Sequence, residues 1–317
     1  MIESFIFIGE ESLGSALSEK LVAAGYKLAP KLAEADVVLV YCDSQSDTED
    51  MFFETDGIIQ RAKNGSYLVN LSTCTPNFSR ELNAVALVSD LHALEAPLMV
   101  LDSTLPKVFA DHANLDCFVS GEEDDVEVII PLLSAIAANV RVSGPSGSAQ
   151  LAHAALTVQR SAQIVACMEA EALFRAYSSS SDSAIRTTYE QGIISDSSLK
   201  MFAAIKNEQF NGDYTIKMWM AELTSALMTA DDAELILPGA ESCIHLLELL
   251  AVIGGDSLAP AALSLVYGEE SACIKHGLDW TLAEQIYGEE GFDHDFDEDP
   301  GHDHGDFPGG FGSYSSN

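Results

Sequence analysis

Apolar positions in the first part of the chain form short continuous runs, separated by stretches in which they recur every three or four residues. A run covers residues 5–8, and helical spacing follows at residues 13–24 until Gly25 ends the pattern. A short apolar run predicts a buried strand, and spacing of three and four predicts one face of a helix. The chain is therefore expected to open with a βα unit.

The same alternation continues along the chain. Further apolar runs cover residues 37–41, 67–71 and 117–120, and helical spacing returns at 126–138. Strands that alternate with helices are typical of a doubly wound parallel sheet. Residues 1–143 are therefore predicted to form a Rossmann-like α/β domain.

A second domain is expected after the segment from Gly144 to Gly147, which reads as a joint. Residues 148–177 predict one long helix, and the pattern stays helical up to residue 287, so 144–287 is interpreted as an interdomain helix followed by an all-helical domain. Residues 288–317 are rich in Gly, Asp and His and lack Lys and Arg. This tail is expected to be disordered.

Composition limits the partners and the cellular location. Fifty acidic residues against fifteen basic ones give a formal charge of −35, which argues against nucleic acid and anionic membranes as partners. The six cysteines show no C-x-x-C pair and predict buried, reduced thiols. The N-terminus lacks a basic, apolar leader, and no segment reaches the roughly 18 apolar residues of a membrane span. A cytoplasmic protein is expected.

The turn between the first strand and helix is the first candidate site. Gly9, Leu13 and Gly14 match a dinucleotide-binding turn of the form G-x-G-x-x-G, but Glu11 stands where the second glycine is expected. A carboxylate about 4 Å from a phosphate costs about 4 kcal/mol at an effective dielectric of ~20. Glu11 is therefore expected to oppose a cofactor, either as a cap of the helix N-terminus or, alternatively, in a catalytic role.

Several motifs in a fixed order resemble the β-hydroxyacid dehydrogenase family, which includes the 3-hydroxyisobutyrate and 6-phosphogluconate dehydrogenases. The similar segments are Ser72-Thr-Cys-Thr-Pro76 with Arg80-Glu-Leu82, Glu95-Ala-Pro97, residues 118–133, and Gly147-Ser-Ala-Gln-Leu-Ala-His153. The resemblance implies a Rossmann domain followed by a helical domain. It also implies NAD(P), a small hydroxyacid substrate and a homo-oligomer.

The resemblance also locates the expected catalytic positions. The catalytic lysine of the family falls on His153, its helical partner asparagine on Thr157, and a lysine–aspartate pair on Ala221 and Glu222. Both lysines are thus absent. The stretch between residues 28 and 37 is too short for the second βα unit, which in such folds carries the residue that holds the ribose.

Two hypotheses follow from these departures. The first is a degenerate family member that keeps the fold, binds no cofactor, and acts as a binding, regulatory or scaffold protein, as a homo-oligomer or with a protein partner. The alternative is a divergent NAD(P)H-dependent hydroxyacid dehydrogenase or imine or carbonyl reductase, in which His153 donates the proton. A purely structural role for His153, as a histidine on a helix, is the other interpretation. Ser72 is a second catalytic candidate or, equally, part of the turn chemistry at residues 72–76.

The tail offers a weak metal site. His294, His302 and His304 lie among aspartates, and two imidazoles with one residue between them suit zinc or nickel. A solvated acidic tail without a metal is the alternative interpretation.

Overall fold

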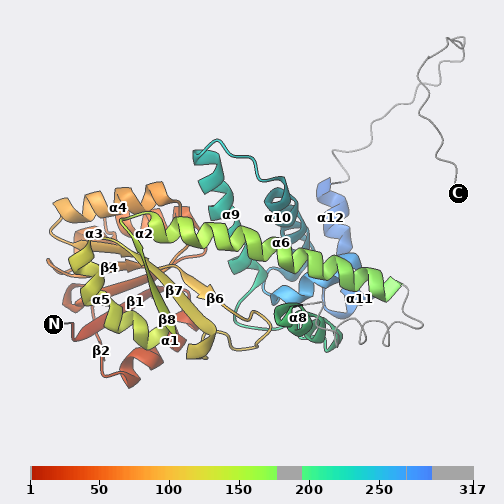
Figure 1. The fold of residues 1–317 in the computed structure, drawn as a ribbon, viewed down its shortest axis with the longest axis horizontal. Helices are drawn as coiled ribbons and strands as arrows, with labels where there is room; N and C mark the ends of the chain where they lie inside the picture. Colours follow the sequence, from red (N-terminus) through yellow and green to blue (C-terminus); the bar gives the residue numbers. More distant parts are fainter. Residues whose placement is uncertain (1, 177–194, 269, 288–317) are drawn as a thin grey trace, which may run out of the picture.

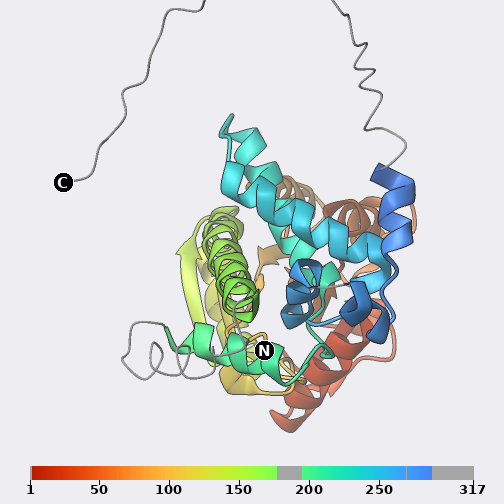
Figure 2. The ribbon, with the colours of Figure 1, turned by 90° about the vertical axis from the view of Figure 1, so that its right-hand side faces the viewer.

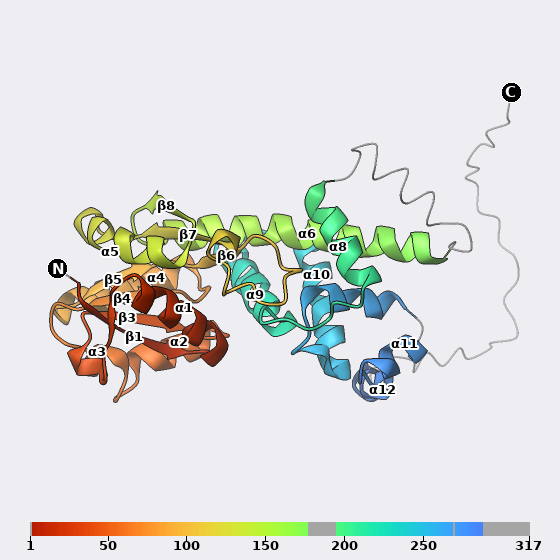
Figure 3. The ribbon, with the colours of Figure 1, turned by 90° about the horizontal axis from the view of Figure 1, so that it is seen from below.

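A computed structural model describes residues 2–176, 195–268 and 270–287. A sheet domain and a helical domain lie end to end, and the long helix α6 (Ser148–Ala176) runs from one to the other, as Figures 1 and 3 show. In Figure 2 this helix is seen nearly end-on beside the helices of the second domain. The predicted α/β class, with a helical domain after the sheet, is confirmed.

The sheet has eight strands in the order β2-β1-β3-β4-β5-β7-β6, with β8 paired to β7. Neighbouring strands are parallel except where β7 meets β5 and β6, so the sheet is mostly parallel. The strands are β1 (Ser4–Gly9), β2 (Lys27–Leu28), β3 (Val37–Tyr41), β4 (Tyr67–Asn70), β5 (His92–Glu95), β6 (Leu98–Val100), β7 (Leu115–Ser120) and β8 (Asn139–Gly144).

Helices cover both faces of the sheet, and each face has its own apolar core. On one face, α1 (Glu11–Ala23) and α5 (Glu123–Ile136) bury leucines and isoleucines such as Leu17 and Ile129 against the strands. On the other face, α2 (Gln45–Phe53), α3 (Ile58–Arg61) and α4 (Pro76–Val88) bury Phe52 and Phe78. These two layers confirm the doubly wound arrangement.

The second βα unit is reduced to a remnant, as predicted from its length. Strand β2 has two residues, both exposed, and pairs with β1. A single 3-10 turn, η1 (Leu32–Glu34), then leads the chain across to β3 on the other side of β1. No α-helix of the described chain lies between β2 and β3, so the edge of the sheet beside β1 is short.

The helical domain packs around the second half of α6. Its elements are α8 (Asp196–Lys206), α9 (Ile216–Asp232), α10 (Pro238–Leu250), η3 (Ala251–Gly255), η4 (Pro260–Tyr267), α11 (Glu270–Lys275) and α12 (Trp280–Tyr287). Helix α9 packs along α6 and lies between the two domains. Five of the six cysteines are buried and all six are free thiols, as expected.

No described helix is by itself long and apolar enough to cross a membrane. Two helical segments, Pro238–Gly255 and Pro260–Tyr267, are together long and apolar enough by length and composition only, and they are bent by 91° relative to each other.

Candidate functional site

The turn after β1 keeps the backbone geometry of a dinucleotide-binding turn. Gly9 has a φ of +128°, and a Cβ added there would lie 1.7 Å from the carbonyl oxygen of Tyr41. A Cβ at Gly14 would lie 2.4 Å from the ring of Phe7, so this glycine lets α1 pack closely on β1. Only glycine suits either position, and both are roles that the fingerprint assigns to glycine.

The carboxylate that occupies the start of α1 is Glu10 and not Glu11. Glu10 is the N-cap residue, and its Oε2 accepts hydrogen bonds from the Leu13 amide at 2.6 Å and from Ser12 Oγ at 3.0 Å. Glu11 is the first helical residue and is exposed. The prediction that Glu11 caps the helix is therefore wrong by one position. An anion at this helix start competes with Glu10 for the Leu13 amide.

A hollow of about 880 Å³ separates this turn from the helical domain. Its walls include Glu10 and Ser12 at the start of α1, Lys107 from the loop after β6, and Lys217 on α9. Lys217 pairs with Asp43 at 2.7 Å, and this pair also lines a second hollow of about 460 Å³. Ala221, which stands where the family has a lysine, lies in the wall of the second hollow.

A cluster of buried titratable side chains stands behind these two hollows. Glu222 on α9 is 7% exposed, and Tyr214 and Tyr41 are similarly buried. Burial raises the pKa of Glu222 to about 7, although the charge of Arg160 and the Tyr214 hydroxyl both act to lower it. Burial also raises the pKa of Tyr214 well above 10, and the nearby Glu222 carboxylate adds to this rise. Glu222 is therefore an acid poised to exchange a proton near neutral pH.

Glu222 lies on the same side of α9 as residues that line the two hollows. Met218, four residues earlier, lines the first hollow, and Ser225, three residues later, lines the second. Residues at these intervals share one face of a helix. Tyr41 lies at the end of β3, between the turn and the cluster. Burial raises the pKa of its hydroxyl, and the charges of both Glu222 and Glu10 add to this rise. The sequence placed Glu222 at a family position but gave it no role.

His153 lies in the interior and does not suit the predicted role of proton donor. The side chain is 1% exposed, and its Nε2 lies 3.1 Å from the carbonyl oxygen of Leu98 on β6. Its Nδ1 lies 3.4 Å from Thr157 Oγ1. Burial lowers the pKa of His153 to about 4, so the ring is neutral at pH 7 and its N–H faces a backbone carbonyl.

Ser72 is also committed to internal bonds. It is fully buried, and its Oγ accepts a hydrogen bond from the Cys42 amide at 2.9 Å. Its carbonyl oxygen accepts another from Gln150 Nε2 at 2.8 Å, which links the end of β4 to α6. The structure favours the structural alternative for Ser72 over the catalytic one.

The N-terminus of α6 holds a buried carboxylate that the sequence did not reveal. Glu95 is 3% exposed, and its oxygens accept hydrogen bonds from the amides of Gly147 at 2.8 Å and Ala149 at 3.0 Å. Ser146 Oγ donates a further bond at 3.3 Å. Glu95 ends strand β5, so this cap fixes the interdomain helix to the sheet. Glu95 opens the Glu95–Pro97 segment in which the sequence resembles the family.

The loop that follows Glu95 carries no polar groups for a substrate. Leu98, Met99 and Val100 form the short buried strand β6, each at most 5% exposed. The candidate ligands His294, His302 and His304 lie outside the described residues. Within the part of the chain that the structure covers, no group of three or more His, Cys, Asp or Glu side chains is arranged to hold a metal.

Comparison with known proteins assigns these features to a family. Residues 5–144 match the family model for the NAD-binding domain of 6-phosphogluconate dehydrogenase. An uncharacterized oxidoreductase of Bacillus subtilis, YkwC, is 26% identical over 227 residues, 71% of this chain and 76% of that protein. The 2-hydroxy-3-oxopropionate reductase of Escherichia coli is 24% identical over 285 residues, 81% of this chain and 94% of that protein.

Solved structures show the same fold. A 3-hydroxyisobutyrate dehydrogenase from Mycobacterium tuberculosis superposes with a TM-score of 0.71 at 18% identity, covering 85% of this chain and all of that one. The similarity therefore extends over both domains.

These matches correct two predictions. The hypothesis of a degenerate binding or scaffold protein is wrong, because the similar proteins are named as oxidoreductases. The prediction that the chain has no cofactor is wrong as well, because the sheet domain matches an NAD-binding domain. The two glycines keep the backbone geometry of the turn, and the single carboxylate beside them does not remove it.

The glycine turn, the two-domain cleft and the matching segments lead to one conclusion. The chain is a distant member of the β-hydroxyacid dehydrogenase and 6-phosphogluconate dehydrogenase NAD-binding family.

Proposed function

We propose that this protein is an NAD(P)-dependent oxidoreductase that interconverts a small carbonyl or imine compound and its reduced form. The observation that carries the proposal is the Gly9–Gly14 turn, which opens onto a hollow between the domains within a segment that matches an NAD-binding domain. Hydride transfer is the chemistry that the cofactor supplies. The chain must supply binding, orientation and a proton.

The turn fits the pyrophosphate of NAD(P) once Glu10 turns away. The close backbone approach at Gly9 and the first amides of α1 are the groups that hold phosphate in such turns. Lys107 and Lys217 in the walls of the hollow add positive charge. Glu10 is a local and partly exposed side chain, so it can leave the Leu13 amide without rearrangement of the core.

The proton is assigned to Glu222, with Tyr214 beside it. Reduction of a carbonyl places negative charge on oxygen, and an acid whose pKa lies near the working pH neutralises that charge efficiently. Glu222 meets this requirement, because burial holds its pKa at about 7. His153, whose pKa is about 4, carries no spare proton at pH 7. The assignment replaces the two missing lysines by one buried acid.

Two measurements test the proposal. Calorimetric titration with NADH and NADPH should give saturable binding. A panel containing 2-hydroxy-3-oxopropionate, the compound in the name of the Escherichia coli relative, neutral aldehydes and cyclic imines should then show consumption of the reduced cofactor. Turnover should fall as the pH rises through about 7, where Glu222 loses its proton.

A pair of variants separates the two proton donors. Glu222→Gln should reduce turnover about 100-fold with unchanged cofactor binding, since loss of a general acid typically costs 10²–10⁴. His153→Gln should leave the pH profile of turnover unchanged. A profile that moves only in His153→Gln contradicts the assignment to Glu222, and the absence of binding by either cofactor contradicts the proposed function itself.

A further inference from the structure

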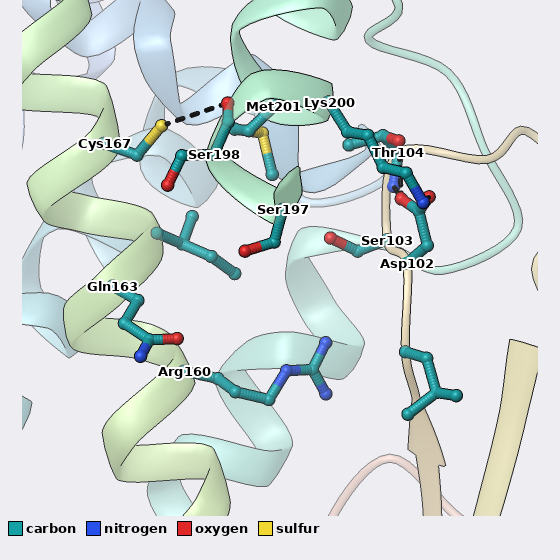
Figure 4. A pocket seen from close by; sticks show the side chains of 12 residues that line it. Asp102, Ser103, Thr104, Arg160, Gln163, Cys167, Ser197, Ser198, Lys200 and Met201 are labelled. Carbon is teal, nitrogen blue, oxygen red and sulfur yellow. Dashed lines mark hydrogen bonds and ion pairs between the residues drawn. The ribbon is translucent and has the colours of Figure 1, made fainter. Parts of the chain in front are cut away.

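A pocket and a hollow outside the cleft differ in how their charged side chains are paired. The pocket, of about 140 Å³, lies between α6, α8 and the loop after β6, and Figure 4 shows Lys200 and Asp102 side by side in its wall. Their charged atoms lie 2.8 Å apart. The hollow, of about 980 Å³, is lined by β1, α2, α3 and the segment around η1, and we call it the β1 hollow. None of its carboxylates forms an ion pair within the described residues.

The floor of the β1 hollow is an apolar part of the sheet that the helices of this face leave partly open. Ile6 and Ile8 of β1 are half-buried there, on the face where Leu32 of η1 packs. Met51 of α2, also half-buried, adds to the apolar wall. The chain crosses from β2 to β3 over this face with a single 3-10 turn, whereas a helix usually makes such a crossover in a doubly wound sheet. The β1 hollow therefore lies where the layer of helices is incomplete.

The rim of the β1 hollow is acidic. Its charged residues are exposed, and the carboxylates outnumber the cations: Asp47, Asp50, Glu54, Asp56, Lys31 and Arg61. The two cations are engaged elsewhere, since Lys31 pairs with Glu34 at 3.9 Å and Arg61 donates to the backbone carbonyl of Asp56 at 3.3 Å. In the part of the chain that the structure describes, no cationic side chain pairs with Asp50, Glu54 or Asp56. An acidic rim around an apolar floor favours a ligand with positive charges beside an apolar face.

We propose that the β1 hollow docks an amphipathic helix of a partner protein, with apolar side chains on one face and lysines or arginines beside them. Such a helix completes the layer on this face and presents about three or four apolar side chains per two turns to the floor. Residues 288–317 of this chain lack Lys and Arg, and a second copy brings a formal charge of −35, so neither neutralises the rim. The site is independent of the cofactor assignment, because none of its lining residues belongs to the glycine turn or to the two hollows of the cleft.

A designed peptide tests this site on the full-length protein. The probe is a fluorescently labelled peptide of about 14 residues, with leucines every three or four positions and lysines elsewhere. The control peptide has the same composition, rearranged so that the leucines share no face of a helix. Fluorescence anisotropy should show saturable binding of the probe and at least tenfold weaker binding of the control, because both carry the same charge and only the probe has an apolar face.

Two variants of the β1 hollow locate the binding on the protein. Met51→Lys places a charge in the apolar wall and should weaken binding of the probe at least tenfold, since the docked helix would bury that charge. The double variant Asp50→Asn with Glu54→Gln removes two carboxylates from the rim and should weaken binding about threefold to tenfold, because exposed ion pairs are individually weak.

Matched controls make the same changes of charge on α5, which covers the opposite face of the sheet. Val128→Lys, and the double variant Asp124→Asn with Glu127→Gln, alter exposed side chains and should bind the probe as the wild type does. Circular dichroism should show that each variant is folded.

Four outcomes overturn the proposal. Two of them are equal binding of the two peptides by the wild type, and equal weakening by the β1 hollow variants and the α5 variants. Competition by a synthetic peptide of residues 288–317 would assign the hollow to the tail of this chain. A lower mass of Met51→Lys than of the wild type in light scattering would assign it to a second copy.

Discussion

Helices α1 and α6 both begin at a carboxylate, but one carboxylate is next to its helix in the sequence and the other is distant from it. Glu10 caps α1 from the residue directly before it and is partly exposed. Glu95 caps α6 from the end of another strand, 52 residues before Gly147, and is 3% exposed. A local, exposed cap can be exchanged for a ligand at small cost, whereas a distant, buried cap holds the tertiary structure together.

The same contrast extends to the surroundings of each helix start. Around the turn, the charged residues Glu10, Lys107 and Lys217 line an open hollow. Around the start of α6 and at its packing with α9, His153 and Glu222 are buried and have displaced pKa values. Substitutions at the turn are therefore expected to change binding. Substitutions at the domain joint are expected to change folding and, at Glu222, turnover as well.

The largest effect is expected for Glu95→Ala. This substitution leaves the amides of Gly147 and Ala149 buried without a partner, and each such group costs roughly 1–3 kcal/mol. The free energy of unfolding, measured by urea denaturation, should fall by on the order of 4 kcal/mol.

Glu10→Ala, at the other helix start, is the control for that loss. It should lower the free energy of unfolding by about 1 kcal/mol, the usual value of an N-cap. Similar losses in the two variants would contradict the distinction between a replaceable cap and a structural one.

The second effect concerns the pH dependence of stability. The pKa of Glu222 is raised from 4.5 to about 7. Its contribution to the free energy of unfolding is therefore complete below pH 4.5 and is lost as the pH rises through 7. The pKa of His153 is lowered from 6.5 to about 4, so its contribution is complete above pH 6.5 and is lost as the pH falls through 4. In the wild type the two slopes oppose each other between about pH 4.5 and 6.5.

In each variant, the pH dependence of stability should follow the one titratable group that remains. In Glu222→Gln, stability should rise between pH 4.5 and 6.5 relative to the wild type, and in His153→Gln it should fall, each by on the order of 2–3 kcal/mol. Urea denaturation at three pH values measures both. Parallel pH profiles in the wild type and both variants would show that the two groups titrate normally.

The third effect is a gain in cofactor affinity. Glu10→Ser keeps a capping oxygen for α1 and removes the negative charge from the N-terminus of α1, where the cofactor phosphate would bind. Affinity for NADH should rise about tenfold, equivalent to roughly 1.4 kcal/mol, with little change in stability. Glu11→Ser removes an equal charge from the exposed first helical residue and should change the affinity less. The ranking of these two variants by calorimetry decides which glutamate competes with phosphate.

The smallest effect is expected at the ion pair between Lys217 and Asp43. The Lys217 side chain is 62% exposed, and exposed pairs contribute about 1 kcal/mol or less. Lys217→Met should therefore change the free energy of unfolding by less than about 1 kcal/mol. A larger change in the free energy of unfolding, measured in the same urea assay, would show that this ion pair stabilises the fold as the buried groups of the domain joint do.

Much of the fold could be predicted because buried parallel strands leave long apolar runs. Strands β1, β3 and β4, helix α1 and the long helix α6 lie where the apolar pattern placed them. Strand β8 was missed because it is largely exposed and has no apolar run. Strands β5 and β6 are short and are separated by two residues, which gives the pattern too little length to show.

The candidate site could be predicted less well, because its groups depend on contacts between distant segments. The sequence indicated a carboxylate at the turn, but two consecutive glutamates do not show which one precedes the helix. The sequence placed His153 at a catalytic position, but the Leu98 carbonyl that accepts its N–H comes from a strand 55 residues away. The cap by Glu95 leaves no local signal for the same reason.

The two-residue strand β2 has a consequence for the choice between coenzymes. Rossmann enzymes distinguish NAD from NADP mainly through a residue that follows the second strand and meets the 2′ position of the adenosine ribose. Here β2 ends at Leu28 and a 3-10 turn leads directly to β3, so the unit that carries this residue is reduced to a few residues. We expect the protein to accept both dinucleotides with similar affinity, which would let it draw reducing equivalents from either cellular pool.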